Sequence, residues 1–380
     1  MEWLIGSGHA EAKRWVSQLS DPNKRERAAA ELIRLGAEAA PTLIEALPAR
    51  DTNLPPFIAP VLVRIGSPAI PALTKALCET HPLVRVQIAD ILGQIKDRAV
   101  LPALLEALRS EYYTVRAHSA TALGNIGDVQ AIQALSAALK DSESQVRIAA
   151  VEALGNFRDP NTFDEIANLL LDDPIIEVRQ AAARALGKTK HPAALGYLME
   201  ALHDSFWWYE RETAASDLLE AIEAIGAPAV NPLIEALNDP EATIRRFAAI
   251  LLGKLGDARA IEPLGMSLYD LHHEVGKTAA EALTHFGGAS FEVLAEALRH
   301  PETGIREQAV IALGKIQDAR VPSALIKMLK DPERSVQKQT IQALAHMRNE
   351  HVTLVLRELA ANRTDRELSA LAKQALATTR

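Results

Sequence analysis

The sequence predicts an all-α protein, an α-solenoid (superhelix) of about twelve helical hairpins. A pattern of Leu-Gly followed by a hydrophobic residue and Asp returns along the chain at spacings of 30 to 36 residues. A period of this length is typical of repeat arrays. Each interval holds two stretches with the apolar spacing of an amphipathic helix. Only 4% of the 380 residues are aromatic although 48% are hydrophobic, which favours packed helices over a β-sandwich.

A glycine after leucine marks the end of each regular unit. Six units carry this glycine, at Gly93, Gly124, Gly155, Gly187, Gly253 and Gly314. Six degenerate units hold another residue at the same position, namely Ile33, Val63, Glu223, Thr284, Ala345 and Ala377. The twelve units together cover nearly the whole chain, and so regular a spacing does not arise by chance.

The first half of each unit predicts one helix. Residues 99–108 and 131–139 place Leu and Ala on one helical face. Proline often stands in the first turn, where its missing N–H costs nothing. These prolines are Pro71, Pro102, Pro232, Pro263 and Pro322. Asp-Pro or Asp-Ser commonly follows and predicts a turn.

The second half predicts another helix, as in residues 146–155 and 305–314. We expect this helix to end at the repeat glycine, because glycine adopts the left-handed conformation without a Cβ clash. One hairpin cannot bury both of its apolar faces, so neighbouring hairpins must stack. We expect the second helices to form the inner, concave layer of the stack.

The repeats predict a single continuous array over residues 1–380. Two stretches depart from the pattern. Near 50–65, Pro55 and Pro56 stand where other units have Val-Arg, and the unit at 204–226 carries extra residues. We therefore expect the array to be irregular at these two places.

The alternation of x-D-x-x-x-x-V-R-x-x-A-x-x-A-L-G with A-h-x-x-L-x-x-A-L, where h is hydrophobic, resembles the HEAT repeat. It is more narrowly similar to the short HEAT-like repeats of phycobilisome-lyase proteins. The resemblance implies a HEAT-like solenoid over nearly the whole chain. It also implies, as one activity, the attachment, removal or isomerisation of a linear tetrapyrrole on an antenna protein.

Composition excludes several classes of function. The formal net charge is −8, and no run of five basic residues exists, so a nucleic-acid partner is not expected. The single cysteine, Cys78, excludes an internal disulfide. No apolar stretch reaches the length of a membrane span, and the N-terminus lacks the pattern of a signal peptide. We expect a cytoplasmic protein without membrane insertion.

An arginine ladder follows the repeat. Its members are Arg85, Arg116, Arg147, Arg179, Arg245 and Arg306. Each stands near the start of a predicted second helix, and in three units an Asp precedes it by six residues, at Asp141, Asp173 and Asp239. One reading is an anion-binding track. The favoured reading is structural, in which each guanidinium bridges turn carbonyls and Asp carboxylates of its own and neighbouring repeats.

Aromatic and histidine residues gather in predicted turns, where stacking would place them along one edge of the array. The candidate partner-binding residues are Trp207, Trp208, Tyr209 and Arg211 in one turn, Tyr112 and Tyr113 with Arg116 and His118 in a second, and His272 and His273 in a third. Trp and Tyr offer large contact area at low entropic cost. Trp207 and Trp208 either recognise a partner or planar ligand, or fill a packing gap at the insertion.

The second-helix face is the other candidate surface. Besides Arg116 and His118 it offers Asn125, Gln145, Glu152, Arg184 and Lys188. This mixed polarity suits a protein partner better than a polyanion.

Catalytic and metal motifs are absent from the sequence. The strings at Gly187 and Gly276 lack the upstream glycine of a phosphate loop. His273-Glu274 is the single dyad that resembles those of a HEAT-like di-iron hydroxylase family, and one dyad cannot hold two irons. We expect no catalytic residue, no metal and no cofactor.

Two functions remain open. The favoured one is a non-enzymatic scaffold or adaptor that binds a partner protein through the concave face and the turn edge. The alternative follows the phycobilisome-lyase resemblance and gives a tetrapyrrole-bearing protein as partner. Arg or His would then bind the bilin propionates and aromatic side chains would flank its rings.

Overall fold

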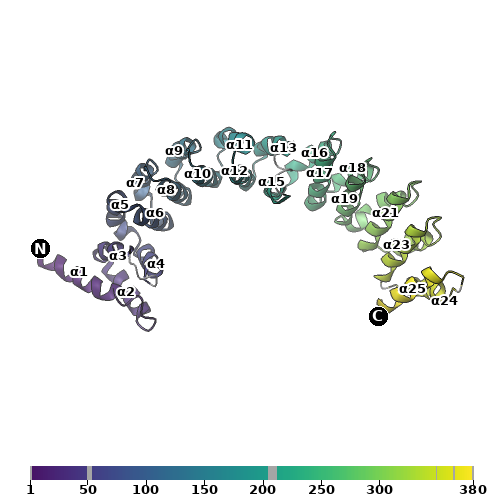
Figure 1. Cartoon of the computed structure of the whole chain (residues 1–380), viewed down its shortest axis with the longest axis horizontal. Helices are drawn as coiled ribbons and strands as arrows, with labels where there is room; N and C mark the ends of the chain where they lie inside the picture. Colours follow the sequence, from purple (N-terminus) through teal and green to yellow (C-terminus); the bar gives the residue numbers. More distant parts are fainter. Residues whose placement is uncertain (1, 49–53, 204–211, 348, 363, 379–380) are drawn as a thin grey trace. The chain divides into compact units, whose positions relative to one another are not determined.

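A computed structural model describes residues 2–48, 54–203, 212–347, 349–362 and 364–378. Every regular element among these residues is helical and no strand occurs there, which confirms the all-α prediction. Contacts divide the chain into two compact units, unit 1 (Met1–Ala221) and unit 2 (Ile222–Arg380). Figure 1 gives the helix labels used below.

Each repeat contributes a first helix and a second helix, and twelve such pairs lie within the described residues. The first helices of unit 1 are α1 (Glu2–Val16), α3 (Ala40–Ala46), α5 (Ile70–Glu79), α7 (Leu101–Ala107), α9 (Ile132–Ala138), α11 (Phe163–Asp172) and α13 (Leu195–Leu202). Its second helices are α2 (Arg25–Leu35), α4 (Pro55–Ile65), α6 (Pro82–Ile95), α8 (Tyr113–Ile126), α10 (Ser144–Phe157), α12 (Ile176–Thr189) and α15 (Glu212–Ile225), which contains the unit boundary.

Unit 2 continues the same alternation. Its first helices are α16 (Val230–Ala236), α18 (Ile261–Ser267), α20 (Phe291–Ala297), α22 (Val321–Met328) and α24 (Glu350–Ala361). Its second helices are α17 (Ala242–Leu255), α19 (His273–Thr284), α21 (Thr303–Lys315), α23 (Arg334–Ala345) and α25 (Arg366–Thr378). The prediction of about twelve helical hairpins is confirmed.

Short 3₁₀ helices lead into most first helices. They are η1 (Gly36–Glu38), η2 (Ser67–Ala69), η3 (Arg98–Val100), η4 (Val129–Ala131), η5 (Pro160–Thr162), η6 (Pro192–Ala194), η7 (Ala227–Ala229), η8 (Ala258–Ala260) and η9 (Gly287–Ser290). An Asp side chain caps several of them, as where Asp128 accepts from the N–H of Gln130 at 3.0 Å. Prolines such as Pro71 and Pro102 lie in the first turn of the following α-helix, as predicted.

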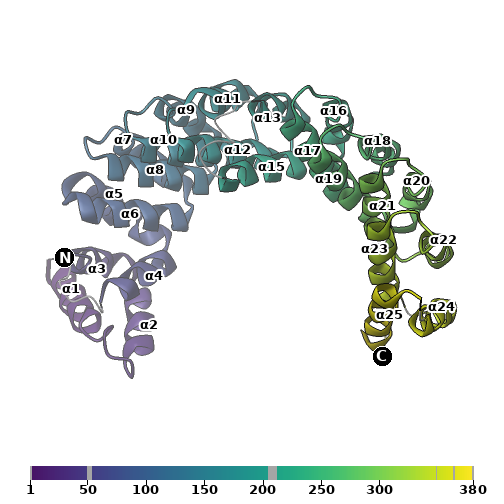
Figure 2. The same cartoon turned by 45° about the vertical axis from the view of Figure 1, so that its right-hand side comes forward.

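Within unit 1 the helices form two layers. The second helices α6, α8, α10 and α12 pack side by side, and the first helices cover them on one side (Figure 2). The core lies between the layers, where Leu123, Leu135 and Leu154 are fully buried. Each repeat thus obtains part of its dry interior from the next one.

The repeat glycines do not end the second helices, so that expectation is wrong. Gly124 lies inside α8, and a Cβ on it would stand 2.6 Å from the Cβ of Ala153 in α10. Matching contacts join Gly93 to Ala122, Gly155 to Ala185, Gly187 to Ala221, Gly253 to Ala282 and Gly314 to Ala343. These glycines let neighbouring second helices approach closely, because any side chain would separate the two backbones.

The left-handed residue lies three positions later in the repeat. Positive φ angles occur there at Lys96, Gly127, Arg158, Lys190 and Gly256, and in degenerate repeats at Gly36, Gly66, Gly226 and Gly287. In α6, α8, α10, α12 and α17 the helix therefore runs for two residues beyond the repeat glycine before it stops.

The two irregular stretches are described in part. Residues 49–53 and 204–211 lie outside the described residues. Pro55 and Pro56 begin α4, and Pro60 stands inside it. Among the described helices none alone has both the length and the apolar character of a membrane span. One pair, Pro56–Ile65 with Ser67–Glu79, meets that test only when its two parts are combined across a bend of 106°.

Candidate protein-binding surfaces

The arginine ladder is built at the turn between the first and second helix. The Arg306 guanidinium donates from Nε and Nη2 to the two carboxylate oxygens of Asp331, each at 2.8 Å. Its Nη1 donates to the carbonyls of His300 and Pro301, each at 2.9 Å. The Asp331 carboxylate in turn accepts from the N–H of Glu333 at 2.9 Å. One buried ion pair therefore joins two successive repeats and stabilises both turns.

Three other arginines make the same bidentate contact to the next repeat. The pairs are Arg116–Asp141, Arg147–Asp173 and Arg245–Asp270. Arg85 and Arg179 each donate from Nε to a carbonyl of their own turn, at Thr80 and Asp173 respectively. These bonds confirm the structural reading of the ladder, because the guanidinium donors face inward to protein oxygens.

The ladder also sets the charge state of its carboxylates. The hydrogen bonds from Arg245 hold the pKa of Asp270 below its ordinary value. Burial would raise the pKa of Asp331, but its bonds to Arg306 and to the Glu333 N–H outweigh burial and leave it lowered. Both carboxylates are therefore ionised at neutral pH, as the ion pairs require.

The ladder is not continuous in unit 2. In α23, Gln337 replaces the arginine, and its Nε2 donates to the carbonyl of Asp331 at 2.6 Å. In α19 the change involves both partners. Gly276 stands where an arginine is expected, and the next repeat has His300 in place of the partner aspartate. The ring of Tyr269 stacks on that of His300 at 4.9 Å between centroids and 28° between planes. Sequence reasoning missed this replacement, although the paired loss of Arg and Asp at matching positions was visible.

The turn residues predicted for partner binding are only partly brought together. Tyr112 and Tyr113 are exposed at the start of α8. All three nitrogens of the Arg116 guanidinium are bound to Asp141 and to carbonyls of its own turn. His118 lies further along α8, where its Nδ1 is 2.7 Å from the Asp90 carboxylate of α6.

The two histidines of unit 2 that were predicted to bind a partner, His272 and His273, lie at exposed positions. His272 immediately precedes α19, and the Nε2 of His273 is 3.0 Å from the Nε2 of Gln308 in α21. Within the described part of the chain, no three His, Cys, Asp or Glu side chains gather as metal ligands. The other predicted residues, Trp207, Trp208, Tyr209 and Arg211, lie outside the described residues.

The second-helix face of unit 1 contains a hollow of about 300 Å³, called here the second-helix groove. Its rim is polar and consists of Thr121 and Asn125 on α8, Glu152 and Asn156 on α10, and Arg184 and Lys188 on α12. Its floor is made of alanines. Each helix contributes two of these side chains, one turn apart. The first stands three residues before the repeat glycine of that helix, and the second directly follows it. The sequence indicated four of these six residues but not Thr121 or Asn156.

Hydrogen bonds and ion pairs connect the rim residues of neighbouring repeats. Arg184 lies 3.2 Å from the carboxylate of Glu152 and 3.3 Å from that of Asp217 in α15. Asn156 donates from Nδ2 to the carbonyl of Gly124 at 3.3 Å, and Lys188 donates to Asn156. The rim is thus ordered by its own contacts while its outer edges stay exposed.

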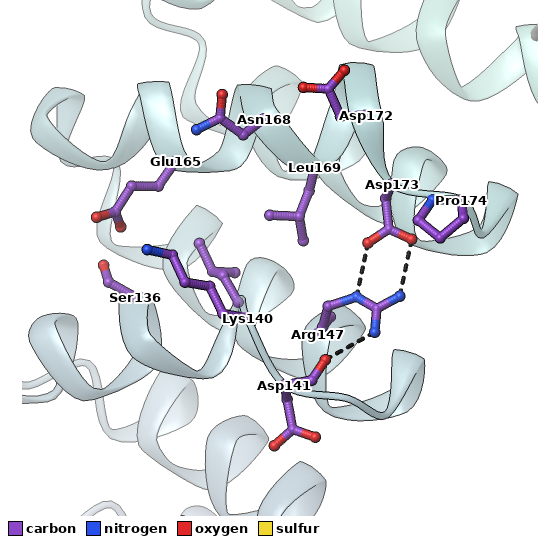
Figure 3. A pocket seen from close by; sticks show the side chains of 11 residues that line it. Ser136, Lys140, Asp141, Arg147, Glu165, Asn168, Leu169, Asp172, Asp173 and Pro174 are labelled. Atoms are coloured by element: carbon purple, nitrogen blue, oxygen red, sulfur yellow. Dashed lines mark hydrogen bonds and ion pairs between the residues drawn. The ribbon is translucent and has the colours of Figure 1, made fainter.

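A second hollow lies on the first-helix side of unit 1, between α9 and α11, and measures about 450 Å³ (Figure 3). The Arg147–Asp173 pair forms one end of it, and Leu169 points into the space between the helices. Sequence reasoning did not indicate this hollow, because its residues come from two repeats and include no distinctive motif.

A comparison with known protein families identifies repeats over most of the chain. The family model of HEAT repeats matches residues 70–146, 134–219, 216–284 and 291–377. No curated protein sequence matches the chain.

Similar solved structures include the Kap95:Nup1 complex, at 12% identity and a TM-score of 0.55, over 97% of this chain and 61% of that chain. Karyopherin Kap121p bound to the extreme C-terminus of the protein phosphatase Cdc14p matches at 13% identity with a TM-score of 0.52. The match covers 97% of this chain and 54% of that chain. Human deoxyhypusine hydroxylase matches at 24% identity with a TM-score of 0.31, over 68% of this chain and 98% of that chain. The chain spans 54% to 61% of the two karyopherins. At 12% and 13% identity the likeness to the two karyopherins concerns the fold alone. The family match, which covers more than half of the chain, shows that the chain belongs to the HEAT-repeat family.

Proposed function

We propose that the chain is a non-enzymatic scaffold or adaptor that binds a partner protein through its second-helix face and the neighbouring turn edge. The second-helix groove is the observation that carries this proposal. Three successive helices present exposed polar side chains there at one register, around a floor of alanine methyls. An apolar centre within a polar rim that supplies hydrogen-bond donors and acceptors is the general arrangement of a protein–protein interface.

The charges and aromatic residues of unit 1 support a protein as the partner. The rim carries one carboxylate, on Glu152, and two cations, on Arg184 and Lys188, so it offers both signs within a short distance. Tyr112 and Tyr113 add exposed aromatic surface at the start of α8, and such residues often dominate binding energy. The two karyopherin structures with this fold are complexes, one with Nup1 and the other with the C-terminus of Cdc14p.

Affinity capture with identification by mass spectrometry tests the proposal. Thr121→Arg places a long charged side chain at the groove, and we expect it to abolish capture of a partner that the unaltered chain retains. Gln133→Arg on the exposed face of α9 is the matched control and leaves capture unchanged. Equal capture by all three proteins, or no specific partner with any of them, contradicts the proposal.

The turn edge has its own test in Trp207 and Trp208. If they recognise the partner, the double substitution to Ala weakens capture and leaves the melting temperature within about 2 °C, as surface changes usually do. Loss of the fold in that double variant would instead support the packing role. A preserved fold with undiminished capture would remove both residues from the proposed surface.

The bilin alternative draws no support from the geometry of the described residues. Arg116, the donor proposed for a propionate beside Tyr112 and Tyr113, is already bound to Asp141 and to turn carbonyls. Absorbance distinguishes the two functions, because a bound bilin gives a sharpened, red-shifted visible band. We expect no such band when purified protein is mixed with a bilin.

A further inference from the structure

The hollow between α9 and α11, called here the first-helix groove, has an apolar floor and charged walls. On α11, Glu165, Leu169 and Asp172 stand at i, i+4 and i+7, so all three line one stripe of the helix. On α9 and the residues that follow it, Ser136 and Lys140 form the opposite wall. Leu139 and Leu169 are almost fully buried and form the floor.

The ladder removes two of the charges at the end of the groove. Asp173 is neutralised by Arg147, with nitrogen to oxygen distances of 2.8 and 3.0 Å, and Asp141 is neutralised in the same way by Arg116. Two carboxylates, of Glu165 and Asp172, and one cation, Lys140, remain on the walls. None of these three side chains forms an ion pair with another described residue. The groove therefore has a net negative charge that its own structure does not neutralise.

We propose that the first-helix groove binds a basic side chain, arginine or lysine, of a partner protein. The methylene stem would lie on Leu139 and Leu169, where burial of apolar surface is favourable. The cationic end would reach the carboxylate of Glu165 or Asp172, with the Asn168 amide oxygen as a further acceptor. A volume of about 450 Å³ accommodates one long side chain and part of the backbone that carries it.

Charge selects this occupant over others. An acidic side chain would meet two carboxylates and one lysine, and a purely apolar side chain would leave those carboxylates without compensation. A free metal cation would gain nothing from the leucine floor. The inference shares one assumption with the proposed function, namely that the partner is a protein. It does not depend on the second-helix groove, because the first-helix groove is a separate surface.

Ligand-observed magnetic resonance on the full chain tests the inference with three capped amino acids, two of them cationic and one neutral. They are N-acetyl-arginine N-methylamide, its lysine counterpart, and N-acetyl-citrulline N-methylamide, which keeps the shape of arginine without its charge. We expect the two cationic probes to bind and the citrulline probe to bind at least about threefold more weakly. Binding should weaken as salt rises from about 50 to about 500 mM, because the attraction is screened.

Variants assign the binding to the groove. Glu165→Gln and Asp172→Asn should each weaken the arginine probe about two- to fivefold. Lys140→Ala should strengthen it by a similar factor, since it removes the competing cation. Glu106→Gln, an exposed position on α7 outside the groove, is the control and should change nothing. Circular dichroism verifies that all variants fold.

Equal binding of the arginine and citrulline probes, or indifference to both carboxylate variants, overturns the inference. If the probes bind as expected but Thr121→Arg does not affect partner capture, the second-helix proposal fails and this one stands. If capture depends on Thr121 while the probes do not bind, the opposite holds.

Discussion

At the scale of single residues, the turn aspartate serves two repeats at once. Asp331 accepts from the Glu333 N–H within its own turn and pairs with Arg306 of the preceding repeat. The sequence predicted the ladder, because Arg recurs at a fixed position. It also predicted carboxylate partners in the arginine's own and neighbouring repeats. It did not predict that the bidentate partner of Arg306 is the aspartate of the following repeat, 25 residues later, since that depends on how far stacking offsets successive turns.

Removing one charge of this pair should be costly. Asp331→Asn leaves the Arg306 guanidinium, 7% exposed, without a counter-ion, and we expect a loss of about 3 to 5 kcal/mol in the free energy of unfolding. Glu367→Gln is the control, because its pairs with Arg334 and Lys338 are exposed and contribute at most about 1 kcal/mol. Urea unfolding measures both. Equal shifts for the two variants would contradict a buried, structural ladder.

Acid should weaken the fold within a defined window. Hydrogen bonds from Arg259 and Arg320 lower the pKa of Asp257 and Asp318 to about 2, from 3.8. A carboxyl whose folded pKa is lowered contributes stability that is complete above 3.8 and is lost as pH falls toward 2. We expect the melting temperature to fall over that range.

The double variant Asp257→Asn with Asp318→Asn isolates these two groups. Its melting temperature should fall less steeply between about pH 4 and pH 2 than that of the unaltered chain, because two of the titrating carboxyls are gone. If the melting temperatures of the two proteins change with pH in the same way, the Asp257–Arg259 and Asp318–Arg320 pairs do not contribute to stability.

At the scale of elements, the helices themselves were predictable and their close contacts were not. Apolar periodicity and prolines located both helices of each repeat, because these signals are local. The repeat glycine looked like a helix terminus, yet it serves the contact between second helices. Both uses favour glycine, and only the position of the neighbouring helix distinguishes them. The positive φ angles at Lys96 and Arg158 show that the helix stop does not require glycine.

Adding one methyl group at this contact should destabilise the protein. In Gly124→Ala the new Cβ would stand 2.6 Å from that of Ala153, and overpacking of this kind costs about 1 to 3 kcal/mol. The gain in helix propensity offsets at most about 1 kcal/mol. Ala153→Gly added to Gly124→Ala should recover part of the loss. Thermal unfolding measures all three proteins.

Gly196→Ala on α13 is the matched control. It lies in a helix with no atom within 4 Å of its added Cβ, so propensity acts alone and should stabilise by at most about 1 kcal/mol. The prediction is thus a difference in sign between two chemically identical changes. If Gly124→Ala also stabilised the protein, neighbouring second helices would be able to move apart without cost, which contradicts a close-packed contact.

At the scale of the whole molecule, the period of the Leu-Gly pattern was enough to predict the number of repeats. The sequence indicated the second-helix face and four of the six rim residues of its groove. It did not indicate the first-helix groove. Each groove is formed by side chains from two or three repeats, and the sequence does not tell which of them converge. The mixed charge of the second-helix face and the aromatic residues of the predicted turns are the sequence signals that led to the proposal of a protein partner.

Linear stacking predicts that damage stays local. Within each unit, successive repeats contact each other, so stability is a sum of repeat and interface contributions. In Asp331→Asn, hydrogen exchange should accelerate across α20 to α23, which flank the broken pair, and remain unchanged in unit 1. Glu367→Gln should alter exchange at most in α25 and in the first turns of α23, which carry its partners Arg334 and Lys338. Faster exchange spread evenly over all described helices would instead mean that the chain opens as one cooperative body, because coupling would then extend far beyond adjacent repeats.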